Sequence, residues 1–466
     1  MAFNDQDFML RGQAAKRLYE IAKDMPIYDF HCHLDPRAIF EDKPYDNIVD
    51  LWLDGDHYKW RLMRANGVSE ELITGSAPKA EKFRVWIETV SRAFGNPLYH
   101  WSHLELKTVF GIDEVIKAEN WESLYERLNA KLATGSITPR SLLKLSDVRF
   151  VGTTDHPLDD LEWHQKIAAD ETIAVRVAPT FRPDEVFVAH ANFTSFIGAL
   201  ADKTGQVILT FEELVEALDQ RIAYFAAQGC RASDISFGAV QFLETTKDQL
   251  NAILKKALAG QELTELEKNQ WQSGIFLELC KLYHKHGLVT QVHFGAVRNS
   301  HSRLYAKLGA DSGFDSMGDQ IALADHLNRF LDALSKEDQL PKMIWYTLNP
   351  TYNSILANTL ANFQANEEGT KSQLQFGAGW WFNDTKTGML DQMTHYAEQG
   401  LLANFIGMLT DSRSFMSFQR HDYFRRILAS LIGKWVDDED IPNDLELLKP
   451  FVEGICFTNA ETFFGN

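Results

Sequence analysis

The sequence predicts an α/β protein: a (β/α)8 TIM-like barrel with a helical insertion after its first strand. Eight short segments rich in Val, Ile, Phe or Trp recur along the 466 residues, and most precede a polar loop and a stretch of helical spacing. One long interval after the first segment shows helical spacing alone. Eight parallel strands with intervening helices are what a (β/α)8 barrel requires.

The expected strands are short and bounded by polar turns. The first, 27–33, ends before the turn signal Asp35-Pro36. The other seven are 148–153, 174–179, 235–240, 289–294, 343–348, 374–378 and 405–409. Helical spacing is clear at 263–286 and 319–334, and a further helix is expected at 5–23.

The interval 37–146 is expected to be a helical insertion. Its predicted helices are 47–65, 78–94, 97–110 and 121–132, with Gly or Pro between them. This is far more helix than one connection between strands needs. We therefore expect 1–36 and 147–466 to form the barrel, and 37–146 to form a helical subdomain that packs over one end of it.

Composition excludes several classes of protein. The 11 Trp and 31 Phe residues exclude a disordered chain. The net charge of −19 argues against nucleic acid or an anionic membrane as partner, and an acidic substrate would need its own local arginines. Four scattered cysteines without CxxC spacing, and a charged N-terminal segment without an apolar signal core, predict a cytoplasmic protein.

In a closed barrel, polar residues at the carboxyl ends of strands face a common mouth. His31 and His33 end the first strand, project to the same side, and lie about 7 Å apart along the backbone. Two imidazoles on a rigid strand end suit Zn²⁺ or a similar divalent metal. The alternative is a pair of ordinary polar histidines.

Asp411 is the natural third ligand. The eighth strand of a closed barrel neighbours the first, so the carboxylate that follows it can reach an ion held by the two histidines. Two histidines and one carboxylate leave coordination positions open for substrate and water. Asp411 could instead be an N-cap or turn residue.

Arginines at the strand ends point to an anionic substrate. Arg413 follows Asp411 by two residues, Arg298 follows the strand that carries His293, and Arg176 lies in the third expected strand. Guanidinium groups grip carboxylates in a two-pronged geometry. Each Arg taken singly could be a surface salt-bridge residue, and His293 could be a hydrogen-bonded core residue.

The insertion holds a polar, aromatic segment at 54–61 that contains His57 and Tyr58. Tyr58 could donate or accept a proton near a metal. The alternative is a surface tyrosine. In the loops after other strands stand Arg182 and the pair Trp380-Trp381.

Together these motifs resemble the uronate isomerase (glucuronate isomerase) family of the amidohydrolase superfamily. The motifs are His31-Cys32-His33, Tyr58, Trp380-Trp381 and the string Thr-Asp-Ser-Arg-Ser-Phe at 410–415, which is the most specific. Segments 96–106 and 142–151 also resemble the family, so the likeness runs nearly end to end.

The resemblance implies a barrel with one divalent metal per chain, usually zinc. It implies interconversion of D-glucuronate with D-fructuronate and of D-galacturonate with D-tagaturonate, so the partner is a small uronic acid; homo-oligomer formation stays open. It assigns the metal to His31, His33 and Asp411, and proton transfer to Asp411 and Tyr58. The expected substrate-binding residues are Arg413, Arg298, Arg176, His293, Trp381 and His57.

Two rival functions stay open. A metal-dependent hydrolase of the same superfamily typically has a Lys in the fourth strand and a His in the sixth, which support a second metal. The expected strands 235–240 and 343–348 contain neither, which favours one metal. The second rival is a sugar-acid-binding protein without catalytic activity.

Overall fold

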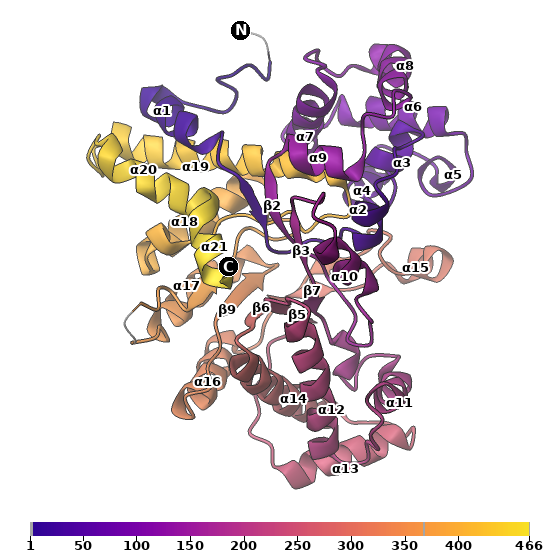
Figure 1. Ribbon diagram of the computed structural model, residues 1–466, viewed down its shortest axis with the longest axis vertical. Helices are drawn as coiled ribbons and strands as arrows, with labels where there is room; N and C mark the ends of the chain where they lie inside the picture. Colours follow the sequence, from indigo (N-terminus) through magenta and orange to yellow (C-terminus); the bar gives the residue numbers. More distant parts are fainter. Residues whose placement is uncertain (1–2, 367–368, 466) are drawn as a thin grey trace.

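The computed structural model describes residues 3–366 and 369–465. Parallel strands run through its centre, surrounded by helices (Figure 1). The central strands are β1 (Ile27–Asp29), β2 (Val148–Gly152), β3 (Arg176–Ala178), β4 (Thr180–Phe181), β5 (Ala232–Phe237), β6 (Val289–Phe294), β9 (Met343–Thr347) and β10 (Leu374–Phe376).

The strands pair in chain order. One sheet has the order β1-β2-β3 and the other β4-β5-β6-β9-β10, with every pair parallel. Pro179, which has no N–H to donate, separates β3 from β4. The chain after β2 continues along both strands through the bonds Thr153 N–H to Ala178 O (3.0 Å) and Asp155 N–H to Thr180 O (3.0 Å). The predicted α/β class is confirmed, and this strand order is the one that a (β/α)8 barrel requires.

The eighth expected strand, 405–409, is not a strand in the structure. Gly407 has a φ of +78° there, and a Cβ on it would stand 2.2 Å from the carbonyl oxygen of Ile455. The left-handed backbone at this glycine interrupts the extended conformation. The chain beyond it still reaches the end of β1, because Asp411 N–H donates to His31 O (3.1 Å) and His33 N–H donates to Ser412 O (2.9 Å).

Short helices fill the interval between β1 and β2, and Figure 1 places α3 to α8 together at the upper right. They are α2 (Pro36–Glu41), α3 (Ile48–Trp52), α4 (His57–Ala65), α5 (Glu70–Ile73), α6 (Lys79–Val90), α7 (Pro97–Glu105), α8 (Trp121–Leu132) and α9 (Pro139–Leu145). The single helix expected at 47–65 is two helices. Gly55, with a φ of +72°, breaks it, and the side chain of Asp56 caps α4 by accepting from Lys59 N–H.

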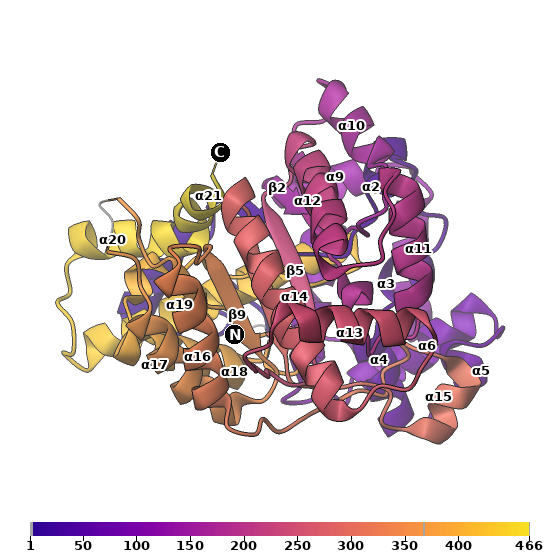
Figure 2. The ribbon, with the colours of Figure 1, turned by 90° about the horizontal axis from the view of Figure 1, so that it is seen from below.

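The remaining helices connect and cover the strands. Figures 1 and 2 show α12, α14 and α16 around the outside of β5, β6 and β9. The elements are α1 (Gly12–Ala22), α10 (Glu162–Ala169), α11 (Phe193–Thr204), α12 (Phe211–Ala227), α13 (Lys247–Leu258), α14 (Glu265–His286), α15 (Ser302–Leu308), α16 (Leu323–Lys336), α17 (Asn353–Asn362), α18 (Lys386–Gln399), α19 (Gln419–Asp437), α20 (Leu445–Glu453) and α21 (Asn459–Phe464). None of the helices in the described ranges is long and apolar enough to cross a membrane.

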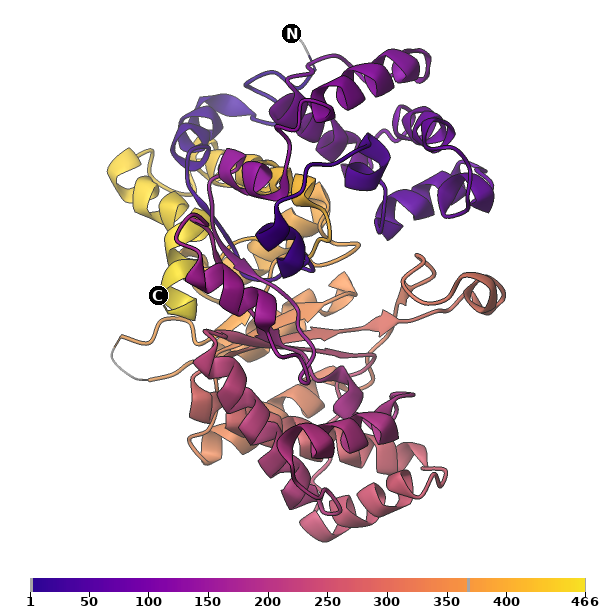
Figure 3. The same ribbon diagram turned by 45° about the vertical axis from the view of Figure 1, so that its right-hand side comes forward.

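A two-stranded hairpin stands apart from the central strands. It pairs β7 (Ala296–Val297) with β8 (Ser316–Met317), and α15 lies between them in the chain. In Figure 3 this segment extends from the end of the strands toward the purple helices of the interval 37–146. Arg61 in α4 fixes it by donating to the carbonyl oxygen of Asp315 (3.1 Å).

Candidate active site

A cavity of about 900 Å³ lies at the carboxyl ends of the strands. Nine of the ten residues expected at the site line it: His31, His33, His57, Tyr58, His293, Arg298, Trp381, Asp411 and Arg413 do, together with Arg182 and Trp380. The structure corrects the expected placement of the tenth, Arg176. Because β3 begins at Arg176, this side chain starts the strand instead of ending it, and its guanidinium carbon lies 5.6 Å from the ring centre of Phe150.

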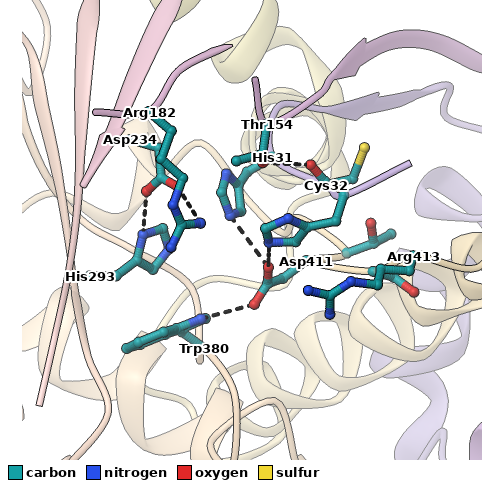
Figure 4. Close-up of polar contacts among 12 residues, drawn as sticks. His31, Cys32, Thr154, Arg182, Asp234, His293, Trp380, Asp411 and Arg413 are labelled. Carbon is teal, nitrogen blue, oxygen red and sulfur yellow. Dashed lines mark hydrogen bonds and ion pairs between the residues drawn. The ribbon is translucent and has the colours of Figure 1, made fainter. Parts of the chain in front are cut away.

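The centre of the cavity is a carboxylate between two imidazoles (Figure 4). Asp411 Oδ1 lies 3.3 Å from His31 Nε2 and 3.1 Å from His33 Nε2. Its other oxygen, Oδ2, accepts a hydrogen bond of 2.9 Å from Trp380 Nε1. The carboxylate is thus oriented from both sides.

Local backbone contacts explain why these side chains meet. Asp411 has a φ of +45°, which turns the chain at the end of segment 405–410. Just before it, Thr410 donates from its N–H and its hydroxyl to the buried carboxylate of Asp29 in β1 (2.7 and 2.6 Å). Thr154 Oγ1 donates to Cys32 O (2.8 Å), between the two histidines. The His-x-His segment is therefore held by its neighbours on both sides.

The charges at this centre favour a bound cation. Burial disfavours ionisation of Asp411, but hydrogen bonds from His31 and His33 hold its pKa well below the usual value. Burial also disfavours the charged form of His31, yet the carboxylates of Asp234 and Asp411 outweigh it and raise the pKa of His31. Burial lowers the pKa of His33, which keeps it neutral as a metal ligand must be.

The donor set fits a divalent metal. One donor atom from each of His31, His33 and Asp411 lies within 4.8 Å of the other two. Two imidazole nitrogens and one carboxylate oxygen are typical of a site that keeps positions open. A second group, His31 with Asp234 and His293, meets the same distance criterion and is fully buried.

A positive charge, the guanidinium of Arg182, already lies beside this second group. Arg182 Nη1 lies 2.9 Å from Asp234 Oδ2, and His293 Nδ1 lies 2.7 Å from Asp234 Oδ1. Burial raises the cost of ionising Asp234, but the Arg182 guanidinium holds its pKa well below the ordinary value. Nε2 of His293 is buried without a hydrogen-bond partner in the part of the chain that the structure describes, on a ring that lines the cavity.

Sequence reasoning missed Asp234. The predicted strand began at 235, whereas β5 begins at Ala232 and includes Asp234 in its middle. The available signal was an aspartate among the otherwise uncharged residues of 232–237, since buried carboxylates are rare unless they are paired. Arg182 was noted in its loop, and the structure brings it into the cavity as the partner of Asp234.

Aromatic side chains form one wall. The ring of His57 stacks on Tyr58 (centroids 5.3 Å apart) and meets Trp381 edge-on (5.3 Å). The guanidinium carbon of Arg298 lies 4.8 Å from the ring centre of Trp381. The wall therefore combines apolar faces with a cation, as sites for small polar ligands do.

Two arginines at the mouth keep much of their surface free. Arg298 lies 3.4 Å from Asp315, and Arg413 lies 3.7 Å from Asp311, while both side chains are 42% exposed. Partly free guanidinium groups in a protein of net charge −19 can receive an anionic ligand.

The parallel α/β fold and a polar cavity at the strand ends are typical of barrel enzymes. Residues 1–464 match the model of a family described as glucuronate isomerase. A uronate isomerase of Streptococcus pneumoniae is 62% identical over 464 residues, covering 100% of both chains, and one of Staphylococcus haemolyticus is 50% identical, covering 100% of this chain and 99% of the relative. The chain belongs to the glucuronate isomerase family.

Solved structures agree. The uronate isomerase of Thermotoga maritima superposes with a TM-score of 0.93 at 33% identity, covering 100% of both chains. The glucuronate isomerase of Caulobacter crescentus gives 0.91 at 25%, covering 99% of this chain and 96% of that one. A putative metal-dependent hydrolase of Lactobacillus casei shares the fold at 13% identity, with a TM-score of 0.54 and coverage of 96% and 97%.

Proposed function

We propose that this chain catalyses aldose–ketose isomerisation of uronic acids: D-glucuronate to D-fructuronate, and D-galacturonate to D-tagaturonate. One observation carries the proposal. The donor set of His31, His33 and Asp411 and the partly exposed guanidinium groups of Arg298 and Arg413 share one cavity. This pairing suits a small molecule that has a carboxylate at one end and a carbonyl at the other.

One divalent metal per chain, Zn²⁺, would be held by His31, His33 and Asp411, where it would polarise the sugar carbonyl and the adjacent hydroxyl.

The four cysteines, all buried and unpaired, suit the reducing cytoplasm, where we place the protein.

The chain's own side chains then have separate tasks. Arg413 and Arg298 grip the C6 carboxylate, so that C1 and C2 of the open-chain sugar lie in one geometry. Asp411 carries a proton between C2 and C1, and the phenol oxygen of Tyr58 accepts a hydrogen bond from a substrate hydroxyl. The indole of Trp381 and the ring of His57 exclude water from one side.

A hydrolase is the second candidate, because the group His31, Asp234 and His293 could hold a second ion. Arg182 weighs against it. Its guanidinium lies 2.9 Å from Asp234 and supplies the positive charge that a second ion would bring.

The test measures turnover of glucuronate and the number of metal ions per chain in the same protein. Protein loaded with Zn²⁺ is incubated with glucuronate, and the keto acid is measured together with metal content per chain. We expect one ion per chain, keto acid formation, and loss of both after chelation. Solvent deuterium at C1 or C2 of recovered sugars would support proton transfer. Two ions and no keto acid would contradict the proposal and favour the hydrolase.

A further inference from the structure

Tyr58 reaches the cavity from α4, but its hydroxyl is held by a distant part of the chain. Tyr58 Oη donates a hydrogen bond of 2.9 Å to Asp384 Oδ2, across 326 positions of sequence. Asp384 is 6% exposed and is not one of the residues that line the cavity. Its other oxygen, Oδ1, is buried and has no hydrogen-bond partner among the described residues. A buried carboxylate with an unused acceptor is costly, so its presence needs an explanation.

The loop that carries Asp384 is closely packed. It connects β10 to α18, and the side chain of Asn383 donates to Leu348 O (2.6 Å). A Cβ on Gly379 or Gly388 would stand 2.3 or 2.2 Å from the carbonyl oxygen of Asn383, so the chain packs there as only glycine permits. Thr385 Oγ1 accepts from Gly388 N–H and caps α18.

The same loop also orients the centre of the cavity. Trp380, four residues before Asp384, donates to Asp411 Oδ2 (2.9 Å). One loop therefore contacts both Asp411 and Tyr58, the two groups to which we assign catalytic roles.

The charge behind Tyr58 determines which way its proton points. Burial raises the pKa of Asp384 to about 6, while the positive charge of Arg420 and the hydrogen bond from Tyr58 oppose the rise. Burial, and then the charge of Asp384, raise the pKa of Tyr58 well above its ordinary value. The phenol stays protonated and donates to the carboxylate of Asp384. An ionised carboxylate has no proton and can only accept.

Arg420 completes the arrangement. Its guanidinium carbon lies 5.7 Å from the ring centre of Tyr58 and 4.2 Å from that of Trp101, and Nη1 donates to Thr410 O (3.1 Å). Arg420 is buried, so its charge is weakly screened and helps to keep Asp384 ionised.

We propose that Asp384 is a positioning residue: it holds the Tyr58 phenol with its proton turned away from the cavity, so that the phenol oxygen accepts from a substrate hydroxyl. This inference rests on the proposed function, because it concerns the role of Tyr58 in that reaction. Asp384 acts through Tyr58 and does not touch the substrate.

A double-mutant cycle tests the proposal. The variants are Asp384→Ala, Tyr58→Phe and the double variant, with kcat and KM for glucuronate measured on metal-loaded protein. We expect Asp384→Ala to lower kcat about tenfold or more, with little change in KM, because partners that orient a reacting group are typically worth 10–100-fold. In the Tyr58→Phe background the same change should cost no more than about twofold.

A merely structural role gives a different pattern. Equal losses from Asp384→Ala in both backgrounds, an unchanged kcat for Asp384→Ala, or an unchanged kcat for Tyr58→Phe would each overturn the proposal. Asp155→Asn removes another buried carboxylate, one that bonds Thr153 and Thr180, and serves as control with kcat unchanged.

If Asp384→Ala does not fold, Asp384→Leu carries the cycle, because Leu has a similar branched shape and can neither accept the hydrogen bond from Tyr58 nor carry a charge. A coupling with Tyr58→Phe is again expected, and additive losses would again overturn the proposal. Wild-type protein that binds metal but does not isomerise glucuronate would refute the proposed function itself. Failure of the proposed function can therefore be told apart from failure of the proposal for Asp384.

Discussion

The indole of Trp380 donates a hydrogen bond of 2.9 Å to Oδ2 of Asp411, while Oδ1 of the same carboxylate faces His31 and His33. The bond fixes the plane of the carboxylate, and with it the direction in which Oδ1 meets a metal. Outer hydrogen bonds of this kind orient metal ligands and contribute to affinity.

We predict that Trp380→Phe weakens metal binding about 10–100-fold, because it keeps an aromatic ring but deletes the N–H that orients Asp411. Competition with a chromophoric chelator measures the affinity. Trp381→Phe is the matched control, since Nε1 of Trp381 is buried without a hydrogen-bond partner in the described ranges. Equal affinities for Trp380→Phe and Trp381→Phe would show that the hydrogen bond does not orient a ligand.

The second prediction concerns Arg413. Arg413→Lys keeps the charge but cannot make a two-pronged contact with a carboxylate. Loss of one charge-assisted hydrogen bond is worth about 1.5–3 kcal/mol, or roughly ten- to a hundredfold in kcat/KM for glucuronate. Arg329→Lys, at an exposed position on α16, should leave kinetics unchanged. Wild-type kinetics for Arg413→Lys would remove it as the carboxylate anchor.

Selectivity is the third prediction. Glucose offers a hydroxymethyl group where glucuronate has a carboxylate, and it leaves the guanidinium donors under-satisfied. Sites built around such polar groups reject the analogue by about 10⁴ or more in kcat/KM. Raising salt should not abolish the preference, because ion pairs that the bound sugar covers are screened less than surface charges. Comparable kcat/KM values for the two sugars at either salt concentration would contradict a uronate site.

The fourth prediction tests the buried ion pair of Arg182 and Asp234. Arg182→Met leaves the Asp234 carboxylate buried without its cation, which typically costs 3–5 kcal/mol in the free energy of unfolding. Urea unfolding measures the loss. The double variant Arg182→Met/Asp234→Asn should recover part of it, because the uncompensated charge is gone. A stability for Arg182→Met equal to wild type would show that the pair adds nothing.

Sequence periodicity predicted the parts of the site that depend on one strand or on the order of strands. His31 and His33 share a side because strand residues alternate. Asp411 was expected beside them because the last strand of a barrel neighbours the first, and the segment reaches β1 although Gly407 prevents a regular strand.

The sequence could not predict contacts that depend on side-chain packing between distant segments. Asp384 meets Tyr58 across 326 positions, and no local pattern marks either residue as the partner of the other. Arg176 was misplaced for a related reason: apolar spacing shows that a strand exists but locates its ends only within a few residues. An error of that size moves a side chain from one end of a short strand to the other.

Asp155 provides the last prediction, a pH-dependent stability. Its carboxylate is buried at the corner where β3 gives way to β4, and Oδ2 accepts from Thr153 Oγ1 (2.7 Å) and Thr180 N–H (3.0 Å). Burial raises the pKa of Asp155 to about 7, although these hydrogen bonds oppose the rise and the charge of Asp159 adds to it. Burial lowers the pKa of nearby His164 to about 4, so this ring stays neutral above that pH.

The sign follows from proton binding in the two states. An unfolded Asp has a pKa of about 3.9, so the folded chain binds the proton more tightly and the contribution to stability is complete below about pH 4. It is lost as the pH rises through about 7, and amounts to roughly 4 kcal/mol at most. Asp155→Asn cannot ionise and should not show this loss. Urea unfolding of both proteins at pH 5, 6 and 7.5 should therefore give a free-energy difference, variant minus wild type, that grows with pH. A difference independent of pH would mean that Asp155 does not titrate in this range in the folded protein.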